Sequence, residues 1–361
     1  MKMYRIETNK KTNKFKKRRR LKLISVSALL IATISILSFA PITITKTKFT
    51  YPSGWPQPRY NFKTHPLSEE GFQLGRKLFY DPILSKDSTI SCSSCHLQAT
   101  GFTHVDHSLS HGINGLIGSR NSSTIMNLAW NQFFMWDGGV NHIEVLALAP
   151  ITNPLEMDET MTHVVQKLNS SKFYRQKFQE LYNDSVITGQ HLLLAITQFI
   201  IQFNTFNSKY DKVMRHEIGI EFTQQELNGL KLFRANCASC HTEPLFTNGN
   251  FENNGLPLDT SLGDIGRMKI TQLKQDSLKF KVPTLRNIQF TQPYMHDGRF
   301  KKLPEVINHY TIEKEISPTL SNKLARPIKL NPNEKIDLIA FLYTLTDKEF
   351  LFNPRYGYPK P

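Results

Sequence analysis

The chain has 361 residues, four cysteines and a formal net charge of +15. Eleven Lys or Arg fall in the first 22 residues, so that residues 41–361 hold 34 basic and 29 acidic side chains, a net charge of +5. Because these residues are nearly balanced in charge, the high net charge of the whole chain does not indicate nucleic-acid binding. The roughly 320 residues that remain are enough for two domains of ordinary size.

The first 40 residues are predicted to be an export signal. A basic segment is followed by the apolar run Leu23–Ala40, and Ser38-Phe-Ala40 is a small-x-small cleavage site. The run has about 18 residues, near the lower limit for crossing a bilayer, so an uncleaved membrane anchor is the alternative. No Cys stands directly after the run, which excludes a lipoprotein. Either outcome predicts a periplasmic protein, with residues 41–65 as an extended lead-in.

The first half begins with a predicted helix. Ser68 is its cap, and Asp81-Pro82 ends it. The motif Cys92–His96, which reads Cys-Ser-Ser-Cys-His, follows. A closing helix is predicted from about Gly189 to Phe206, behind Thr188 as cap. Its apolar positions recur at helical spacing and are Leu192, Ile196, Phe199, Ile200 and Phe203.

The second half repeats this order. Gly229–Phe233 (Gly-Leu-Lys-Leu-Phe) matches Gly75–Phe79 (Gly-Arg-Lys-Leu-Phe), and a capping box, Thr223 to Glu226, precedes it. The motif Cys237–His241, which reads Cys-Ala-Ser-Cys-His, follows. A closing helix begins at Asn331, with Pro at its first position and Glu334 reaching back. Its predicted core face is Ile336, Ile339, Ala340 and Leu342.

Each Cys-x-x-Cys-His motif is the attachment pattern of a c-type haem. In each motif the two thiols form thioethers with the haem vinyl groups, and the His that follows binds the iron. The thiols are those of Cys92 and Cys95 in the first motif and of Cys237 and Cys240 in the second, and the iron ligands are His96 and His241. The two motifs use all four cysteines. A zinc ribbon would not require a His directly after both Cys pairs, and the βαβ pattern expected around a thioredoxin-like disulfide is absent. We therefore predict two covalent haems.

Helix, haem motif, irregular loop and closing helix is the plan of a cytochrome c domain, and it occurs twice. The sequence has no extended stretch in which apolar and polar residues alternate, so no sheet of appreciable size is predicted. We therefore predict an all-α fold of two cytochrome c-like domains, residues 66–215 and residues 216–361, each with one covalent haem.

At this point the chain resembles the bacterial di-haem cytochrome c peroxidases and MauG-like proteins. The resemblance covers residues 66–347 and implies that the two haems face each other across the domain interface. The stretches that carry it, in this order and interleaved with the haem motifs, are Gly118–Asn121, Phe134–Gly138, Ala149–Met157, Val282–Asn287 and Pro293–Phe300.

The resemblance implies that peroxide reacts at the haem of His96. Glu156, twenty residues after Trp136, is then the distal acid–base residue, because splitting the O–O bond requires a proton to move between the two oxygens. Composition alone would make Glu156 a solvated loop residue. The family usually carries a Gln ten residues after the Trp, where this chain has Leu146. A leucine side chain cannot hydrogen-bond peroxide, which puts efficient activation in doubt.

His111 stands where the peroxidases carry a His that binds the first haem iron in the resting oxidised state. In the family this ligand leaves when the second haem is reduced. His104 and His107 are competitors, and a solvent-exposed role is the alternative for all three. MauG-like members lack such a ligand.

For the second haem the resemblance implies Tyr310 as the iron ligand opposite His241, as in MauG-like proteins; the peroxidases have Met at this position. A phenolate lowers the reduction potential of the iron and a thioether raises it. Met295 and His309 are rival ligands, although Met295 also suits apolar packing.

Trp136 is implied to carry electrons between the haems, and core packing is its alternative role. The family also holds a calcium ion at the domain boundary. Its ligands map to the Asn121 side chain and the backbone carbonyls of Thr291 and Pro293, completed by waters. All-oxygen ligation of this kind suits calcium.

The predicted function is that of an exported peroxidase, which reduces hydrogen peroxide to water with electrons from a small soluble donor such as a cytochrome c. The alternative is a MauG-like oxidase that uses peroxide on a protein or small-molecule substrate, which Leu146 and Tyr310 both favour. A plain di-haem electron carrier is a third class, but it would leave Glu156 without a role. A homodimer is common in the family.

Overall fold

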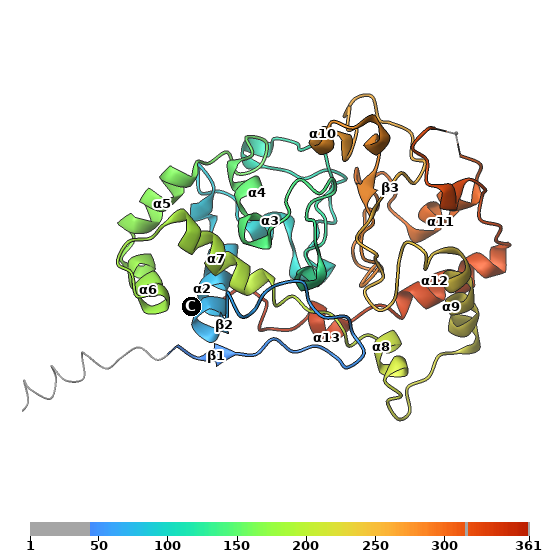
Figure 1. Cartoon of the computed structure of the whole chain (residues 1–361), viewed down its shortest axis with the longest axis horizontal. Coiled ribbons are helices and arrows are strands. Elements are labelled where there is room, and N and C mark those ends of the chain that lie inside the picture. Colours follow the sequence, from blue (N-terminus) through green and yellow to red (C-terminus); the bar gives the residue numbers. More distant parts are fainter. Residues whose placement is uncertain (1–43, 315–316, 360–361) are drawn as a thin grey trace, which may run out of the picture. The chain divides into compact units, whose positions relative to one another are not determined.

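The computed structural model describes residues 44–314 and 317–359 (Figure 1). The predicted export signal or anchor at residues 1–40 lies outside these ranges. Within them, no helix combines the length and the apolar character that crossing a membrane requires. Residues 45–361 group into one compact unit, which contains the elements described below.

The first core is built on α2 (Glu69–Tyr80) and α7 (Gly189–Ile200), which pack against each other. Ser68 caps α2 by accepting a backbone N–H of the first turn at 3.0 Å, and Asp81 ends the helix, as predicted. The five apolar positions predicted on the closing helix are all buried. The helix is shorter than predicted, since α7 ends at Ile200.

The second core repeats this pairing with α9 (Gln224–Asn236) and α12 (Pro332–Tyr343). Both predicted capping boxes form. One predicted core position is wrong, because Ile336 is 55% exposed. The helix buries Leu338, Phe341 and Leu342, of which only Leu342 was predicted, and half-buries Ile339 and Ala340.

The duplicated glycines account for the shared plan of the two cores. A Cβ on Gly75 would lie 2.1 Å from the Ala195 carbonyl oxygen of α7, and one on Gly229 would lie 2.0 Å from the Asp337 carbonyl oxygen of α12. Neither gap can hold a methyl group unless backbone moves, so each glycine fixes the closest approach of its helix pair. In α12 this approach is at Asp337, which turns the next residues inward and Ile336 outward.

The remaining helices have 4 to 11 residues. The other helices are α3 (Cys92–Cys95), α4 (Leu148–Thr152), α5 (Met161–Ser170), α6 (Lys172–Tyr182), α8 (Lys209–Met214), α10 (Met268–Thr271), α11 (Leu303–Thr311) and α13 (Lys348–Leu351). Single 3₁₀ turns lie between them: η1 (Pro82–Leu84), η2 (Gln98–Thr100), η3 (Ile113–Gly115), η4 (Leu128–Trp130), η5 (Ile143–Val145), η6 (Lys274–Asp276) and η7 (Asn322–Leu324).

Strands add little to the regular structure. β1 (Lys46–Thr47) pairs with β2 (Leu67–Ser68), and β3 (Phe251–Glu252) pairs with β4 (Phe280–Lys281), both antiparallel. Each of these strands has two residues. The described part of the chain is therefore substantially helical, with long irregular loops, which agrees with the predicted all-α class.

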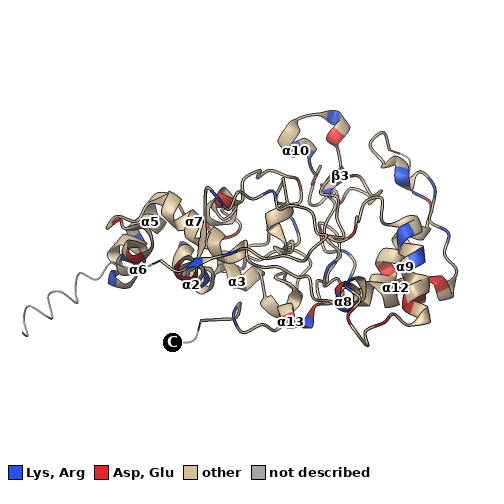
Figure 2. Cartoon of the chain, turned by 60° about the horizontal axis from the view of Figure 1, so that its bottom comes forward, with Lys and Arg blue, Asp and Glu red and all other residues tan. Residues whose placement is uncertain are grey.

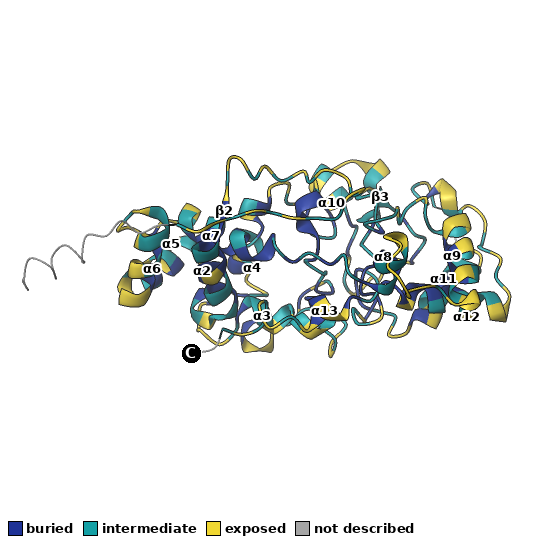
Figure 3. Ribbon diagram, turned by 90° about the horizontal axis from the view of Figure 1, so that it is seen from below, coloured by how far each residue is buried: buried dark blue, intermediate teal, exposed yellow. Residues whose placement is uncertain are grey.

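Buried apolar side chains form two clusters. The ribbon of buried residues is dark blue in Figure 3. The first cluster runs from Leu67 to Phe203 and takes in Phe350 and Leu351 of α13, whereas the second lies between Tyr210 and Leu345. The segment after residue 346 therefore returns to the first core. Acidic and basic residues are interspersed along the unit (Figure 2). The domains 66–215 and 216–361 stay a prediction, and Tyr210, inside the first of them, packs in the second cluster.

Candidate functional site

The second Cys-x-x-Cys-His motif follows directly on α9, with Cys237 at the end of that helix. The Nδ1 atom of His241 lies 3.1 Å from the carbonyl oxygens of both Phe246 and Pro283. Nδ1 therefore carries the ring proton and donates it, which leaves Nε2 with a free lone pair. Burial lowers the pKa of His241 to about 4, so the ring stays neutral, the form that binds a metal.

The first motif repeats this arrangement on α3. The Nδ1 atom of His96 lies 2.8 Å from the Phe102 carbonyl oxygen, and burial lowers the pKa of His96. Burial also raises the pKa values of Cys92 and Cys237 to about 12, so these thiols stay protonated. Each motif thus offers two thiols and a neutral imidazole within five residues, and this donor set fits a covalent haem.

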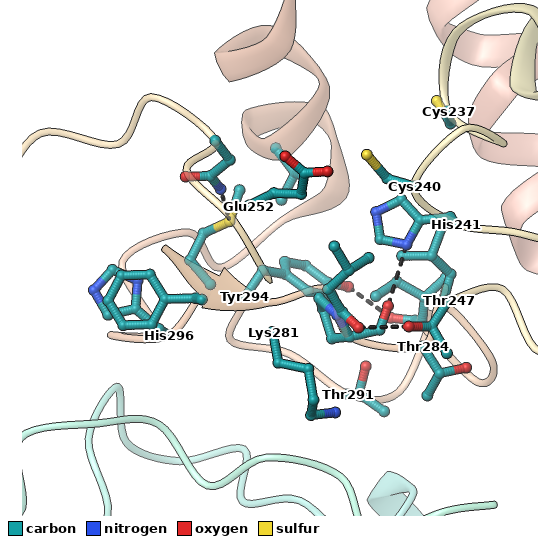
Figure 4. Close-up of a pocket in the computed structure, with 18 of the residues that line it drawn as sticks. Cys237, Cys240, His241, Thr247, Glu252, Lys281, Thr284, Thr291, Tyr294 and His296 are labelled. Atoms are coloured by element: carbon teal, nitrogen blue, oxygen red, sulfur yellow. Dashed lines mark hydrogen bonds between the residues drawn. The ribbon is translucent and has the colours of Figure 1, made fainter. Parts of the chain in front are cut away.

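A cavity opens beside His241 and reaches the first half of the chain (Figure 4). Six of the described residues that line it, besides the second motif itself, were also singled out in the sequence as ligands or electron carriers. They are Asn121 and Trp136 from the first half, and Thr291, Pro293, Met295 and Tyr310 from the second. Glu156, His111 and the first motif lie outside this lining. The structure therefore separates the two predicted haem environments.

Asn254 connects the two rival ligands of the second haem. Its Nδ2 donates to the Met295 sulfur at 3.5 Å, and its side chain also hydrogen-bonds Tyr310. Burial raises the pKa of Tyr310 to about 12, partly offset by that hydrogen bond. His309 is placed differently, since its Nε2 lies 3.1 Å from the Asn254 carbonyl oxygen and the residue is outside the cavity lining. The geometry thus favours Tyr310 or Met295 over His309.

Glu156 lies near the first motif. Its Oε1 accepts the Asn153 side-chain N–H at 3.0 Å, and its backbone carbonyl accepts the Ile113 N–H at 2.8 Å. Burial raises the pKa of Glu156, and the Glu156 charge, after burial, is the next cause that raises the pKa of Cys95. The carboxyl is therefore partly desolvated and close to a haem-attaching thiol. Leu146 is buried in the first core.

Three histidines form a stack next to the first motif. The ring centroids of His104 and His107 are 4.9 Å apart, and those of His107 and His111 are 3.9 Å apart, with nearly parallel planes. The Cys95 thiol donates to the His111 carbonyl oxygen at 3.5 Å. Burial lowers the pKa values of His104 and His111. The structure keeps the three candidate ligands together and does not single out one.

Trp136 and Asn121 link the two halves. The Trp136 indole N–H donates to the Asn121 carbonyl oxygen at 2.9 Å, and the Asn121 backbone N–H donates to the His296 carbonyl oxygen at 2.7 Å. Asn121, Thr291 and Pro293, the three predicted calcium ligands, line the same cavity. Their oxygen atoms suit calcium. The calcium site stays a prediction.

A buried charge network holds the residue next to Trp136. Arg120 donates to both carboxylate oxygens of Asp264 in the second half, at 2.6 and 2.8 Å, and to Asp137 in the first half at 2.6 Å. Such bidentate pairs fix orientation as well as distance. The network thus restrains Trp136 relative to the second half.

Sequence reasoning missed Lys281 and Asn254, which both line the cavity. Lys281 directly precedes the Val282–Asn287 stretch, and its backbone N–H donates to the Trp136 carbonyl oxygen at 2.7 Å. Asn254 falls in an Asn-Asn-Gly sequence, which predicts only a turn. Neither position carries a local signal for a haem environment, because the contacts that matter come from residues far away in the sequence.

Comparisons with known proteins agree with this geometry. The sequence profile of the family described as di-haem cytochrome c peroxidase matches residues 69–218. The chain is 32% identical to the methylamine utilization protein MauG of Methylorubrum extorquens, covering 83% of this chain and 84% of that protein. It is 33% identical to the cytochrome c551 peroxidase of Nitrosomonas europaea, covering 78% of this chain and 81% of that protein.

The fold is likewise similar to a solved structure. The crystal structure of a MauG-like protein associated with microbial copper homeostasis matches with a TM-score of 0.78 and 32% sequence identity, covering 87% of this chain and 99% of that one. The comparisons confirm the predicted enzyme class, an oxidoreductase of the cytochrome-c peroxidase type, and imply two haem c groups. The chain belongs to the family of di-haem cytochrome c peroxidases and MauG proteins.

Proposed function

We propose that this chain reduces hydrogen peroxide to water with electrons from a small soluble donor such as a cytochrome c. Each peroxide takes up two electrons and two protons and yields two molecules of water. The observation that carries the proposal is the partly desolvated Glu156 carboxyl beside Cys95 of the first haem motif. Relatives named cytochrome c peroxidase support the substrate and the kind of donor.

The haems, bound at the two motifs, would supply iron that exchanges one electron at a time. His96 and His241 would hold the two irons through Nε2, since Nδ1 of each ring is engaged with backbone carbonyl oxygens. Glu156 would accept a proton from one peroxide oxygen and donate it to the departing one. It must be deprotonated to begin this transfer, and its raised pKa keeps it ready to give the proton back.

Trp136 is the proposed path for electrons between the two haems. It lines the cavity at His241, and its indole N–H is held by the Asn121 carbonyl oxygen. A calcium ion bound by Asn121, Thr291 and Pro293 would add a further restraint between the halves. Under this proposal His111 binds the first iron reversibly in the oxidised resting state.

Tyr310 favours a second candidate function, peroxide-driven oxidation of a protein or small molecule in the manner of MauG. Its ring lines the cavity beside Cys237 and Cys240, where a phenolate would stabilise the oxidised iron. Leu146, which cannot hydrogen-bond peroxide, points the same way, as do the MauG relatives. An electron carrier without catalysis is disfavoured because Glu156 would then have no role.

The cellular location of the protein is inferred from the predicted export signal at residues 1–40. We propose export to the periplasm, either as a soluble protein after cleavage or held by the uncleaved segment, because c-type haem is attached outside the cytoplasm. The predicted domains, residues 66–215 and 216–361, would each carry one haem. Association into a homodimer belongs to the same proposal.

Electron stoichiometry tests the leading function against the alternative. Known amounts of hydrogen peroxide are added to the haem-loaded protein with excess reduced cytochrome c, and donor oxidation is followed by absorbance. Two donor molecules oxidised per peroxide is the expected result. Peroxide consumption without donor oxidation would favour the MauG-like function, and persistence of peroxide in the presence of the donor would contradict both.

A further inference from the structure

Lys281 extends from β4 into the cavity at His241 and is used by no step proposed above. Its backbone is fixed on both sides, because it pairs with Phe251 of β3 and donates its N–H to the Trp136 carbonyl oxygen at 2.7 Å. In Figure 4 its side chain runs from the strand toward Thr291, and the residue lines the cavity. The Lys281 backbone is therefore fixed beside Trp136, while its side chain lines the cavity.

The Lys281 amine has no ion pair or hydrogen bond with the residues of the described ranges, and burial alone lowers its pKa to about 8. The other charged groups nearby are already engaged. Glu252 on β3 binds Lys323 at 2.7 Å, and Arg120 is held by Asp137 and Asp264. An ammonium in such surroundings is costly unless an anion meets it. We therefore expect the molecule that fills the cavity to place a negatively charged group against the Lys281 ammonium.

We propose that Lys281 binds a carboxylate of the haem attached at Cys237 and Cys240, and that its positive charge raises the reduction potential of that haem. The inference rests on haem attachment at this motif, but not on the reaction with peroxide. Haem carries two carboxylates, and a carboxylate–ammonium contact is a charge-assisted hydrogen bond. Lys281 would thereby act on the second haem from the strand whose backbone also contacts Trp136.

The direction of the effect follows from Coulomb's law. Ferric haem carries one more positive charge than ferrous haem, so a fixed cation beside it destabilises the oxidised form more than the reduced form. Loss of the Lys281 charge should then lower the potential of the second haem. A haem with a higher potential accepts an electron from a donor more readily and passes it on less readily.

The test is a spectroelectrochemical titration of the haem-loaded protein, which follows each haem by its absorbance. Lys281→Met should lower the midpoint potential of the second haem and leave that of the first nearly unchanged, whereas Lys281→Arg should keep the wild-type value. Lys279→Met is the matched control, since Lys279 lies two residues away, pairs with Asp276 at 3.5 Å and does not line the cavity. Lys281→Gln replaces the Met variant if that variant fails to fold.

Equal potentials in the wild type and in the uncharged variants, at full haem content, would overturn the proposal. A wild-type potential that shifts with acetate concentration would also overturn it, because a solvent carboxylate would then be the partner of Lys281. The haem content distinguishes this failure from loss of the site itself, since absence of covalent haem at Cys237 and Cys240 would refute the proposed function as well. Peroxide turnover plays no part in the readout.

Discussion

Burial shifts the pKa values of individual residues near the two predicted haem sites in different directions. It lowers the pKa values of His96 and His241, which keeps both imidazoles neutral and able to bind a metal. It raises the pKa of Glu156, because burial disfavours the charged carboxylate, and this makes the carboxyl hold a proton more readily. It also raises the pKa of Tyr310 to about 12, so that only a strong positive charge such as iron would convert its hydroxyl into a phenolate.

Replacement of Tyr310 by Phe should change the absorbance and electron paramagnetic resonance spectra of the second haem and spare those of the first. The reason is that the phenolate would be an iron ligand, whose loss alters the electronic state of the iron. Met295→Leu serves as the control, because Met295 contacts the same Asn254 amide. A spectral change in the Met295 variant alone would show that the thioether is the ligand.

The rate of peroxide reduction should fall as the pH falls through the raised pKa of Glu156. A protonated carboxyl cannot accept the peroxide proton, so activity is present above that pKa and is lost below it. The dependence of kcat/KM on pH, measured between about pH 4 and 8, reports this group in the free enzyme. An acid limb that stays the same after Glu156→Gln would assign the titration to another residue.

At the scale of elements, packing of the duplicated helix pairs depends on two glycines. Gly229→Ala should lower the free energy of unfolding by about 1–3 kcal/mol, because its methyl group would collide with the Asp337 backbone and force the helices apart. Denaturant titration of the variant measures this loss. Lys231→Ala, at an exposed position of α9, should have little effect. Equal stability of Gly229→Ala and wild type would mean that the helix pair adapts freely.

Local signals in the sequence predicted many of the helix boundaries and buried helix faces. Ser68, Thr223 and Asn331 marked the helix starts because capping depends on residues a few positions apart. The predicted buried face of α12 was partly wrong. Ile336 fits the helical period, but its side chain is exposed, next to the contact of Asp337 with Gly229. Lys281 was missed altogether, because its surroundings are assembled from segments far apart in the chain.

At the scale of the whole molecule, the Arg120 network joins the two halves beside the proposed electron path. Its partners Asp137 and Asp264 lie 17 and 144 residues away along the chain. No spacing rule connects Arg120 with Asp264, so this contact could not be predicted from the sequence. Burial alone would raise the pKa of Asp264, but the hydrogen bonds and charge of Arg120 hold it below its ordinary value.

Arg120→Gln should lower the free energy of unfolding by about 3–5 kcal/mol near neutral pH, because it leaves two buried carboxylates without their partner. A carboxyl with a depressed pKa stabilises the fold above its unfolded pKa, and this contribution is lost as the pH falls. The difference between variant and wild type should therefore shrink below about pH 4. Arg234→Gln removes an exposed ion pair and should cost at most about 1 kcal/mol. A similar loss in both variants would contradict the role of the network.

The most direct test of the account is the effect of Glu156→Gln on peroxide reduction. The account predicts a fall in turnover of about 10²–10⁴-fold, with haem content and spectra unchanged, because the variant keeps the shape of the side chain and loses the proton acceptor. Asp158→Asn makes the same chemical change two residues away, in an ion pair with Lys86 at the surface, and should leave turnover intact. Full activity of Glu156→Gln would contradict the assignment of Glu156 as the acid–base residue.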